Sequence, residues 1–325
     1  MISPRSVDGG FYIPMKKPIV LCGPTASGKT ELALALARRT DGIVISADSR
    51  QVYTQLTIGT AKPLGAWKNQ TYYVEGVPYY LVDFLNVTDT FNAGAFCARV
   101  REIVRENPSK QLIFAGGTGM YLHAYFVGMD ALPAGTPSTR ARLNQLLADE
   151  GKEGLHHALL KCDPESAAVI PVGNIQRTMR ALELFYLTGT PASVLKSGRF
   201  FRLPDEENSH WVYLNWEKSV LQLRISARTE QMFDGMCEET RTLLQKGSPK
   251  EIPALKSLGY PQMIAFLEGT LSREETISQI VLKTRQYAKR QRTWFNRYTK
   301  AQQIVLQKPA DFDTEKLVSS VLSAF

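Results

Sequence analysis

The 325-residue sequence predicts an α/β fold in which a parallel-sheet core is interrupted by an α-helical insertion domain. Up to about residue 125, short apolar runs that suit buried parallel strands alternate with helical segments. From residue 138 to about residue 188 the pattern is helical and contains no strand-like run. An apolar run at Trp211–Asn215 then predicts a strand that returns to the sheet. We therefore expect residues 15–125 and 206–325 to form the core and residues 126–205 to form the insertion.

The first strand, expected at Ile19–Leu21, leads into the octet Gly23-Pro24-Thr25-Ala26-Ser27-Gly28-Lys29-Thr30. This octet matches the phosphate-binding loop (P-loop) G-x-x-x-x-G-K-[ST] at every fixed position, and an Ala/Leu-rich helix is expected at Glu31–Arg39. The glycines let backbone N–H groups face a phosphate, Lys29 adds a positive charge, and Thr30 offers a hydroxyl to Mg²⁺. The core is therefore expected to be P-loop NTPase-like, with these candidate phosphate-binding residues: Gly23, Thr25, Ala26, Ser27, Gly28, Lys29 and Thr30. The motif does not identify the phosphate, which a nucleotide or any other diphosphate can supply.

A second buried strand is expected at Gly42–Ser46, and it ends in Ala47-Asp48-Ser49-Arg50-Gln51. In a doubly wound sheet, ligands bind beside the carboxyl ends of the strands, so a carboxylate here lies next to the P-loop. Asp48 is therefore a candidate base or metal partner. An Asp after a strand also commonly caps the next helix, and position alone favours neither interpretation.

Further along, Tyr79–Phe84 and Gln111–Ala115 are expected strands, and Phe91–Glu106 is an expected helix. The strand at Gln111–Ala115 ends in Gly116-Gly117-Thr118, where an ATPase normally has an Asp or Glu that holds Mg²⁺ and its water. Glycines and a threonine suit close approach to a phosphate and provide no hydrolytic machinery. A tight strand-to-helix turn is a compatible, purely structural interpretation.

The insertion is expected to hold helices at Arg140–Asp149 and Glu153–Lys161, a third from Ser166 and a longer fourth from Gln176. Three of its arginines, at positions 140, 177 and 180, are candidates for clamping phosphates. A solvent-exposed face that is paired with nearby Glu residues is the interpretation favoured by the residues alone.

Cations without counter-charges mark the C-terminal part of the sequence. A helix is expected to begin at Arg224–Arg228, and Lys256–Tyr260 is a loop with a cation and an aromatic residue. Ile277–Lys300 fits an amphipathic helix, and no acidic residue occurs from Thr276 to Ala310. The polar faces of this helix carry Lys283, Arg285, Lys289, Arg290, Arg292, Arg297 and Lys300. Together with the net charge of +8, this pattern favours nucleic acid phosphates as the partner.

Composition argues against several other classes of protein. The four cysteines are far apart and form no C-x-x-C pair, so neither a zinc site nor a redox pair is indicated. No apolar run approaches the ~20 residues of a membrane span. Residues 1–14 show no targeting signal and fit a disordered lead-in, and Met15 would make a natural start. These features predict a cytoplasmic protein with no membrane partner.

In order along the chain, these motifs resemble those of the tRNA dimethylallyltransferases, also called tRNA isopentenyltransferases. The matching segments are Gly23–Thr30, Ser46–Tyr53, Ile58–Pro63, Gly116–Tyr121, Gln176–Glu183, Gly259-Tyr260 and Thr284–Gln291. Asp-Ser-Arg-Gln at 48–51 and Thr-Arg-x-x-Ala-Lys-Arg-Gln at 284–291 are far more specific than the P-loop. The chain departs from the family pattern at Tyr79-Tyr80, where a His pair is common, at Pro171–Asn174 and at Pro261. It also lacks the C-terminal zinc finger of many eukaryotic members, so the resemblance is to the bacterial type.

The resemblance implies transfer of a dimethylallyl group from dimethylallyl diphosphate to N6 of the adenosine that lies 3′ of the anticodon in tRNA. Such a site needs an acceptor for the N6 proton, and cations and hydrogen-bond donors around the diphosphate. By analogy, Asp48 is the base, while Thr118, Arg228 and the P-loop residues named above bind the diphosphate together with Mg²⁺ on Thr30. Register with the family favours Arg228 over Arg224 as the arginine that reaches the diphosphate.

The resemblance also implies a tRNA-binding set and its partner, the anticodon stem-loop of tRNA. That set comprises Asp48, Ser49, Arg50, Gln51, Thr118, Arg140, Gln176, Arg177, Thr178, Met179, Arg180, Lys256 and Tyr260. A monomer is expected.

Two other classes of protein remain as alternatives. A P-loop small-molecule kinase would bind ATP but would have no need for the basic C-terminal helix, and a non-catalytic RNA-binding protein would gain nothing from Lys29 and Thr30.

Overall fold

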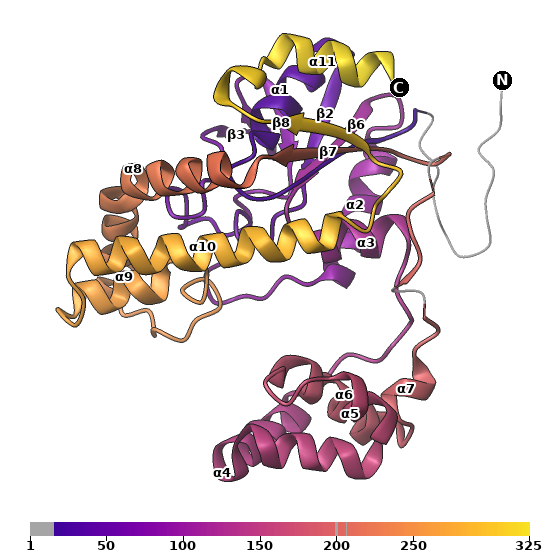
Figure 1. Ribbon diagram of the computed structural model, residues 1–325, viewed down its shortest axis with the longest axis vertical. Helices are drawn as coiled ribbons and strands as arrows, with labels where there is room; N and C mark the ends of the chain where they lie inside the picture. Colours follow the sequence, from indigo (N-terminus) through magenta and orange to yellow (C-terminus); the bar gives the residue numbers. More distant parts are fainter. Residues whose placement is uncertain (1–15, 199–200, 206) are drawn as a thin grey trace. The chain divides into compact units, whose positions relative to one another are not determined.

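The computed structural model describes residues 16–198, 201–205 and 207–325. The chain divides into two compact units: the core unit comprises the residues up to Phe126 together with Leu203–Phe325, and the helical unit is Val127–Arg202 (Figure 1). Each unit has its own cluster of buried apolar side chains. The lead-in expected at residues 1–14 lies outside the described residues.

The core unit is built on an eight-stranded sheet in the order β3-β4-β5-β2-β6-β1-β7-β8. Six of its strands are parallel to one another: β1 (Ile19–Cys22), β2 (Gly42–Ser46), β5 (Val77–Tyr80), β6 (Gln111–Gly116), β7 (His210–Trp216) and β8 (Gln302–Leu306). The other two, β3 (Ala66–Lys68) and β4 (Thr71–Val74), form an antiparallel edge. The predicted α/β fold with a parallel sheet is therefore confirmed.

Strand β1 lies between β6 and β7, with Leu21 opposite Ala115 on one side and opposite Val212 on the other. The chain first leaves β1 for β2, on the far side of β6, and later returns to β7 on the opposite side of β1. Ligands bind at such a reversal of strand order, beyond the carboxyl ends of the strands. Because the P-loop follows the carboxyl end of β1, the topology places it at this point.

Helices cover both faces of the sheet. Along β1, Ile19 and Leu21 belong to the apolar cluster on one face and Val20 and Cys22 to the cluster on the other, as the two-residue period of a strand requires. The helices on the first face include α1 (Lys29–Thr40) and α11 (Thr314–Ser323), and those on the second include α2 (Ala93–Glu106) and α3 (Gly119–Phe126) (Figure 1). Since both faces are covered, the central strands are buried throughout.

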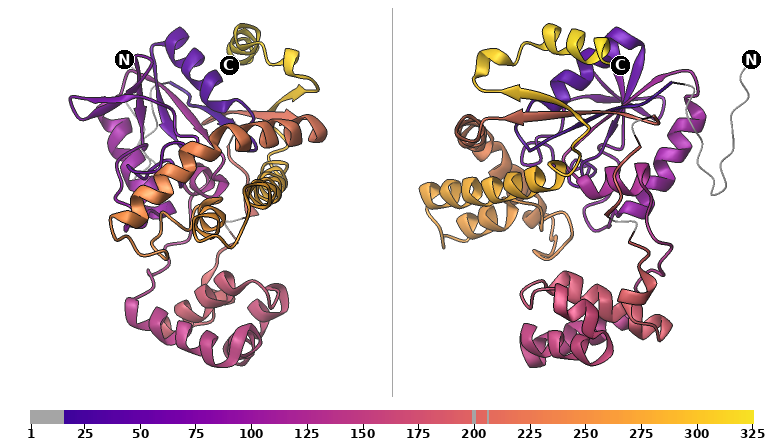
Figure 2. Two further views of the ribbon diagram at one scale, coloured as in Figure 1. Left: turned by 90° about the vertical axis from the view of Figure 1, so that its left-hand side faces the viewer. Right: turned by 45° about the vertical axis from the view of Figure 1, so that its right-hand side comes forward.

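A third apolar cluster lies where three C-terminal helices meet the segment that follows β2. The helices are α8 (Lys218–Gln245), α9 (Tyr260–Leu267) and α10 (Arg273–Phe295). Phe233, Tyr260 and Ile280 contribute one large side chain from each helix, and α8 and α10 pack side by side (Figure 2). This cluster fixes the C-terminal helices to the part of the chain that carries Asp48.

The structure corrects three expected boundaries and adds two strands. The strand expected at Tyr79–Phe84 stops at Tyr80, because Leu81 and Asp83 have positive φ angles of 61° and 55° that end an extended strand. The antiparallel strands β3 and β4 were not expected. Helix α8 begins at Lys218, after the side-chain cap of Glu217, so Arg224 and Arg228 lie inside the helix and not at its start. Helix α10 ends at Phe295, before the expected Lys300.

The helical unit contains α4 (Pro137–Cys162), α5 (Pro164–Val169), α6 (Ile175–Thr188) and the short α7 (Ala192–Leu195). Helix α4 is interrupted at Gly151, whose φ of 70° is not helical, so the two helices expected in this stretch are confirmed. Leu143, Leu159 and Leu182 are fully buried in its apolar cluster. Within the described residues of both units, no helix is long and apolar enough to cross a membrane.

Asp163 connects three elements of the helical unit. Its carboxylate accepts hydrogen bonds from the backbone N–H of Ser166 and from both the N–H and the hydroxyl of Ser193. Burial alone would raise the pKa of this carboxyl, but these hydrogen bonds outweigh it and lower the pKa to about 2. Because the folded-state pKa lies below the ordinary value of 3.8, the stabilisation is present above that value and is lost as pH falls through about 2.

We expect Asp163→Asn to lower the free energy of unfolding by about 2 kcal/mol near neutral pH, because the amide cannot accept all three hydrogen bonds. The loss should shrink as the pH is lowered from about 4 to 2. Thermal and urea unfolding of the full chain at several pH values measures it. Asp149→Asn, at an exposed position of α4, is the control. Equal destabilisation at every pH would contradict the assignment.

Candidate active site

The P-loop curls around its own lysine. Gly28 has a φ of 91°, a left-handed conformation that glycine adopts without strain, and it connects the loop to α1. The ammonium group of Lys29 donates to the carbonyls of Gly23 at 3.1 Å and Pro24 at 2.6 Å and to the hydroxyl of Ser27 at 3.2 Å. Burial lowers the pKa of Lys29 to about 8, although the charge of Asp48 opposes this shift. The amine therefore lies where the motif requires a cation for a phosphate.

Two arginines of α8 contact the loop, one turn apart. Arg228 donates to the Thr25 hydroxyl at 2.6 Å, and Arg224 donates to the carbonyl of Ala26 at 2.9 Å. The Arg224 guanidinium also stacks over the ring of Trp216, 4.4 Å from its centroid. Burial lowers the pKa of the Arg228 guanidinium, and the charge of Asp48 works against that shift. Both arginines line the cavity, so the structure gives each of them access to a phosphate.

A cavity of about 510 Å³ opens over the P-loop. Outside the loop, its wall includes Asp48, Gly116, Gly117, Arg224, Arg228, Tyr287 and Gln291. A side chamber of about 100 Å³ shares Asp48, Arg228 and Tyr287 with it and continues among Met232, Met236, Leu258 and Ile280. The site thus combines a cationic phosphate-binding end with a more apolar chamber.

Asp48 closes a turn and also lines the cavity. Its Oδ1 accepts hydrogen bonds from the backbone N–H groups of Arg50 at 2.8 Å and Gln51 at 3.2 Å. Residues 49–52 form a turn and not a helix, so the interpretation of Asp48 as a helix cap is wrong. Asp48 lines both the cavity and the side chamber, and the turn fixes its carboxylate beside the phosphate-binding loop.

Thr118 supports the turn that carries Asp48. Its hydroxyl accepts from the N–H of Ser49 at 3.1 Å, and its own N–H donates to the carbonyl of Ala47 at 3.0 Å. Thr118 lines neither the cavity nor the side chamber, in contrast to the diphosphate contact expected of it. The hydroxyl of Tyr287 hydrogen-bonds to Thr118, and burial raises the pKa of Tyr287 to about 12.

Gln291 is the site residue that the sequence analysis missed. Its side chain is buried on α10, where Oε1 accepts from the N–H of Thr25 at 2.8 Å and Nε2 donates to the carbonyl of Gly117 at 3.0 Å. One amide thus connects the P-loop to the loop after β6. A glutamine on the buried face of an amphipathic helix must find partners, and that was the available signal.

The residues expected to bind RNA in the core unit have different environments. Arg50 lines the side chamber, whereas the side-chain amide of Gln51 donates to the carbonyls of Thr60 and Ala61. Lys256 is exposed. Tyr260 is fully buried, so the expectation that it lines an RNA path is wrong for this structure.

In the helical unit, the expected arginines are paired with an acid. Glu183, whose side chain is only 5% exposed, accepts from Arg140 at 2.7 Å and from Arg180 at 3.2 Å, as the alternative interpretation predicted. Arg180 also donates to the carbonyl of Pro133. Gln176 and Arg177 are exposed, and Met179 is half-buried against the apolar cluster.

Thr178 differs from its expected role. It is buried, and its hydroxyl donates to the carbonyl of Asn174. The side chain therefore holds the start of α6 and is not available to RNA in this structure.

Helix α10 and the turn after it present the cations expected on its polar faces. Lys283, Arg285, Lys289, Arg290 and Lys300 are exposed, and Arg292 and Arg297 are half-buried. Arg285 donates to the hydroxyl of Ser226 at 3.1 Å on the neighbouring α8. The helix therefore has one face in the cavity, through Tyr287 and Gln291, and cations on its outer faces.

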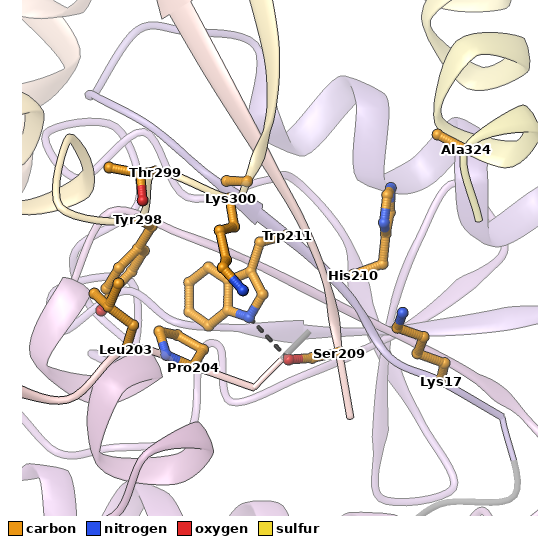
Figure 3. A pocket seen from close by; sticks show the side chains of 11 residues that line it. Lys17, Leu203, Pro204, Ser209, His210, Trp211, Tyr298, Thr299, Lys300 and Ala324 are labelled. Carbon is orange, nitrogen blue, oxygen red and sulfur yellow. Dashed lines mark hydrogen bonds between the residues drawn. The ribbon is translucent and has the colours of Figure 1, made fainter. Parts of the chain in front are cut away.

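A second cavity, of about 210 Å³, lies at the opposite ends of the strands (Figure 3). Lys17 precedes β1 and His210 begins β7, so the cavity is at the amino ends of these strands and away from the P-loop. Its polar groups have partners: the Trp211 indole donates to Ser209 at 2.8 Å, and His210 hydrogen-bonds to Gln302. We assign it no part in the chemistry of the P-loop cavity.

The fold and the cavity define a P-loop protein with an anion-binding site and no acid at the end of β6. The family model described as IPP transferase matches residues 51–298, and the chain belongs to this family. It is 51% identical over 282 residues to the tRNA dimethylallyltransferase of Elusimicrobium minutum, covering 86% of this chain and 91% of that protein. It is 39% identical over 293 residues to the enzyme of the same name from Myxococcus xanthus, covering 89% of this chain and 92% of that protein.

Solved structures agree with this assignment. The tRNA isopentenylpyrophosphate transferase of Bacillus halodurans matches with a TM-score of 0.65 and 30% identity, over 95% of each chain. A eukaryotic dimethylallyltransferase acting on tRNA matches with a TM-score of 0.71 over 95% of this chain and 80% of that one. Its 22% identity supports the fold alone.

Gln291→Glu tests the link between the two glycine-containing loops. A carboxylate can accept from Thr25 but cannot donate to Gly117, and it adds a negative charge beside the phosphate site. We expect roughly 10-fold weaker binding of inorganic pyrophosphate with Mg²⁺, because an unmet buried hydrogen bond costs about 1–3 kcal/mol. Isothermal titration calorimetry measures the affinity. Gln286→Glu, the control, makes the same charge change at an exposed position of α10. Equal pyrophosphate affinities for the two variants would contradict the role of Gln291 in linking the two loops.

Proposed function

We infer that the protein is a tRNA dimethylallyltransferase, which transfers a dimethylallyl group from dimethylallyl diphosphate to N6 of the adenosine 3′ of the anticodon. The observation that carries this inference is that Asp48, Arg228 and the P-loop line one cavity. Relatives that are named for this activity align with this chain over most of their own length, which supports the same conclusion.

The reaction needs the three kinds of group that surround this cavity. The exocyclic N6 amine is a poor nucleophile, since its lone pair is delocalised into the ring. Asp48 accepts its proton as the new N6–C bond forms. The allylic C–O bond breaks, and the diphosphate leaves with the electron pair. Lys29, Arg228 and the P-loop N–H groups stabilise the charge that develops on this leaving group.

The apolar side chamber suits the hydrocarbon part of the substrate. Met232, Met236 and Ile280 supply apolar surface within reach of Asp48 and Arg228, which line both spaces. An apolar chamber also keeps water away from the carbon that is attacked. Water would otherwise compete with the N6 amine for the allylic carbon.

Mg²⁺ is the metal we propose for the diphosphate. Thr30 lines the cavity at the first turn of α1, and we propose that its hydroxyl takes one coordination position. Within the described residues no cluster of three His, Cys, Asp or Glu side chains is present. The remaining ligands would be phosphate oxygens and water, which is a common arrangement for Mg²⁺. When bound, the ion neutralises charge on the diphosphate.

The basic surfaces are proposed to hold the tRNA. The cations of α10 and the turn after it provide phosphate contacts on the core unit, and exposed Gln176 and Arg177 provide contacts on the helical unit. We propose that this unit is the insertion that binds the anticodon arm. The target adenine must leave its stack to reach Asp48, as in other enzymes that modify a base.

We propose that a monomer is active.

Incubating the protein with tRNA and labelled dimethylallyl diphosphate, with labelled ATP in a parallel reaction, tests the proposed function directly. We expect the prenyl label to move to tRNA and the ATP to remain unchanged. Transfer of the γ-phosphate of ATP to a small molecule would support a kinase. Tight tRNA binding without either transfer would support a binding protein.

Asp48→Asn should keep tRNA affinity but slow single-turnover transfer by about 10²–10⁴-fold, the usual effect of losing a general base. The amide retains an oxygen for the turn and cannot accept the N6 proton. Rapid-quench measurements with saturating tRNA give the rate. Asp89→Asn, at an exposed position, is the control. Transfer close to the wild-type rate would leave Asp48 with a structural role in the turn alone.

Arg228→Ala and Arg177→Ala should have opposite effects. Without Arg228, transfer at saturating tRNA should slow by roughly 10²-fold, with tRNA affinity unchanged, because its charge acts on the leaving diphosphate. Without the exposed Arg177, tRNA binding should weaken and the slope of log affinity against log salt should fall by about one unit. Filter binding over a range of salt and single-turnover kinetics separate the two effects. Equal losses in both measurements for both variants would refute this division.

A further inference from the structure

A carboxylate outside the cavity holds one of the cavity walls. Glu239, on α8, accepts hydrogen bonds from three consecutive backbone N–H groups: Thr57 at 2.7 Å, Ile58, and Gly59 at 3.0 Å. Its Oε2 also accepts from the hydroxyl of Tyr260 at 2.8 Å. Hydrogen bonds to an ionised carboxylate are roughly twice as strong as neutral ones, so this anchor is firm.

The loop held in this way reaches the reaction site. Its next residues, Thr60 and Ala61, line both the large cavity and the side chamber. Their carbonyls accept from the side-chain amide of Gln51 at 3.4 Å and 3.0 Å. The backbone N–H of Gln51 in turn donates to Oδ1 of Asp48 at 3.2 Å. Glu239 is therefore connected to Asp48 in steps. Glu239 holds residues 57–59, the next two residues accept from the side chain of Gln51, and the N–H of Gln51 donates to Asp48.

Gly59 packs closely against Tyr260. A Cβ atom on Gly59 would lie 2.4 Å from the hydroxyl oxygen of Tyr260, so only glycine allows the close approach. Burial and the charge of Glu239 raise the pKa of the Tyr260 hydroxyl, which keeps it protonated and donating. Tyr260 thus supports the anchor.

We propose that Glu239 is a positioning residue of the transfer reaction, which fixes the loop 57–61 and, through Gln51, the carboxylate of Asp48. This proposal rests on the proposed function, since it concerns the same site. A carboxylate is required because each oxygen takes two donors: Oε1 takes Thr57 and Ile58, and Oε2 takes Gly59 and Tyr260. In Glu239→Gln, an NH₂ group would replace one oxygen. This hydrogen-bond donor would then lie against at least one backbone N–H, which is also a donor.

The test compares Glu239→Gln with Glu238→Gln, a control at the preceding residue, whose carboxylate is 65% exposed and pairs with Arg241. Hydrogen–deuterium exchange over residues 57–61 reports the anchor, and steady-state kinetics of dimethylallyl transfer report the reaction. For Glu239→Gln we expect faster exchange in this segment, unchanged tRNA affinity and a kcat lowered by about 10- to 100-fold, because small displacements of a reacting group have effects of that size. Glu238→Gln should match the wild type.

Two milder variants keep the test decisive if Glu239→Gln does not fold. Glu239→Asp retains both acceptor oxygens on a shorter side chain, and Tyr260→Phe removes one donor and leaves the three backbone N–H groups. The proposal is supported if the variants with the larger increase in hydrogen–deuterium exchange at residues 57–61 also have the larger loss of kcat. Faster exchange with unchanged kcat, or a loss confined to the KM for tRNA, would overturn it. If the wild type itself transfers no dimethylallyl group while the exchange difference persists, the proposed function fails and the anchor is structural only.

Discussion

The site depends on one constraint: a loop that binds a phosphate with its own N–H groups cannot use most of them to hold its shape. The P-loop is therefore held largely through its carbonyls, two of them by its own Lys29 and others by residues outside the loop. Trp216 donates to the carbonyl of Ser27, and Arg224 donates to that of Ala26. Gln291 holds a single N–H at the start of the loop, on Thr25. These contacts leave the N–H groups at the beginning of α1 for an anion.

The anchors outside the loop all come from distant parts of the chain. Trp216 lies 189 residues beyond its partner in the loop, and Gln291 lies 266 residues beyond its own. The phosphate site is complete only when β7, α8 and α10 have packed against the first half of the core. Helix α10 also presents exposed cations, so the helix that positions the diphosphate loop is also the one that offers contacts to a polyanion. A single rigid element can therefore bring the two proposed substrates together.

The carboxylates of the protein differ in what surrounds them. Buried charges must be paired, and Asp83 accordingly pairs with the buried Lys62, while Glu183 pairs with two arginines. Glu239 is saturated by four donors. Asp48 has two backbone donors on one oxygen and borders the cavity, and it is this partial satisfaction that suits it to accept a proton.

Local sequence determined the parts of this protein that depend on neighbouring residues. The spacing of Gly23, Gly28 and Lys29 defines the P-loop, and the apolar runs around it predict a parallel sheet, because loop conformation and strand burial are encoded within a few residues. The position of Asp48 after the second strand likewise placed it at the site. The one-turn spacing of Arg224 and Arg228 placed them on one face of a helix, and the structure brings both to the P-loop.

Tertiary structure decided which side of a helix faces inward and which distant groups meet. Tyr260 and Thr178 belong to matching motifs, yet both are buried and hold backbone or side-chain partners in place. Glu239 showed no signal of its own. The position of Gln291 on the buried face of a helix indicated that it needs partners, but not which ones, because the partners of these two residues lie about 180 and 266 residues away in sequence. A hydrogen bond between such distant segments exists only after the sheet and helices have packed, and local sequence patterns carry no information about that distance.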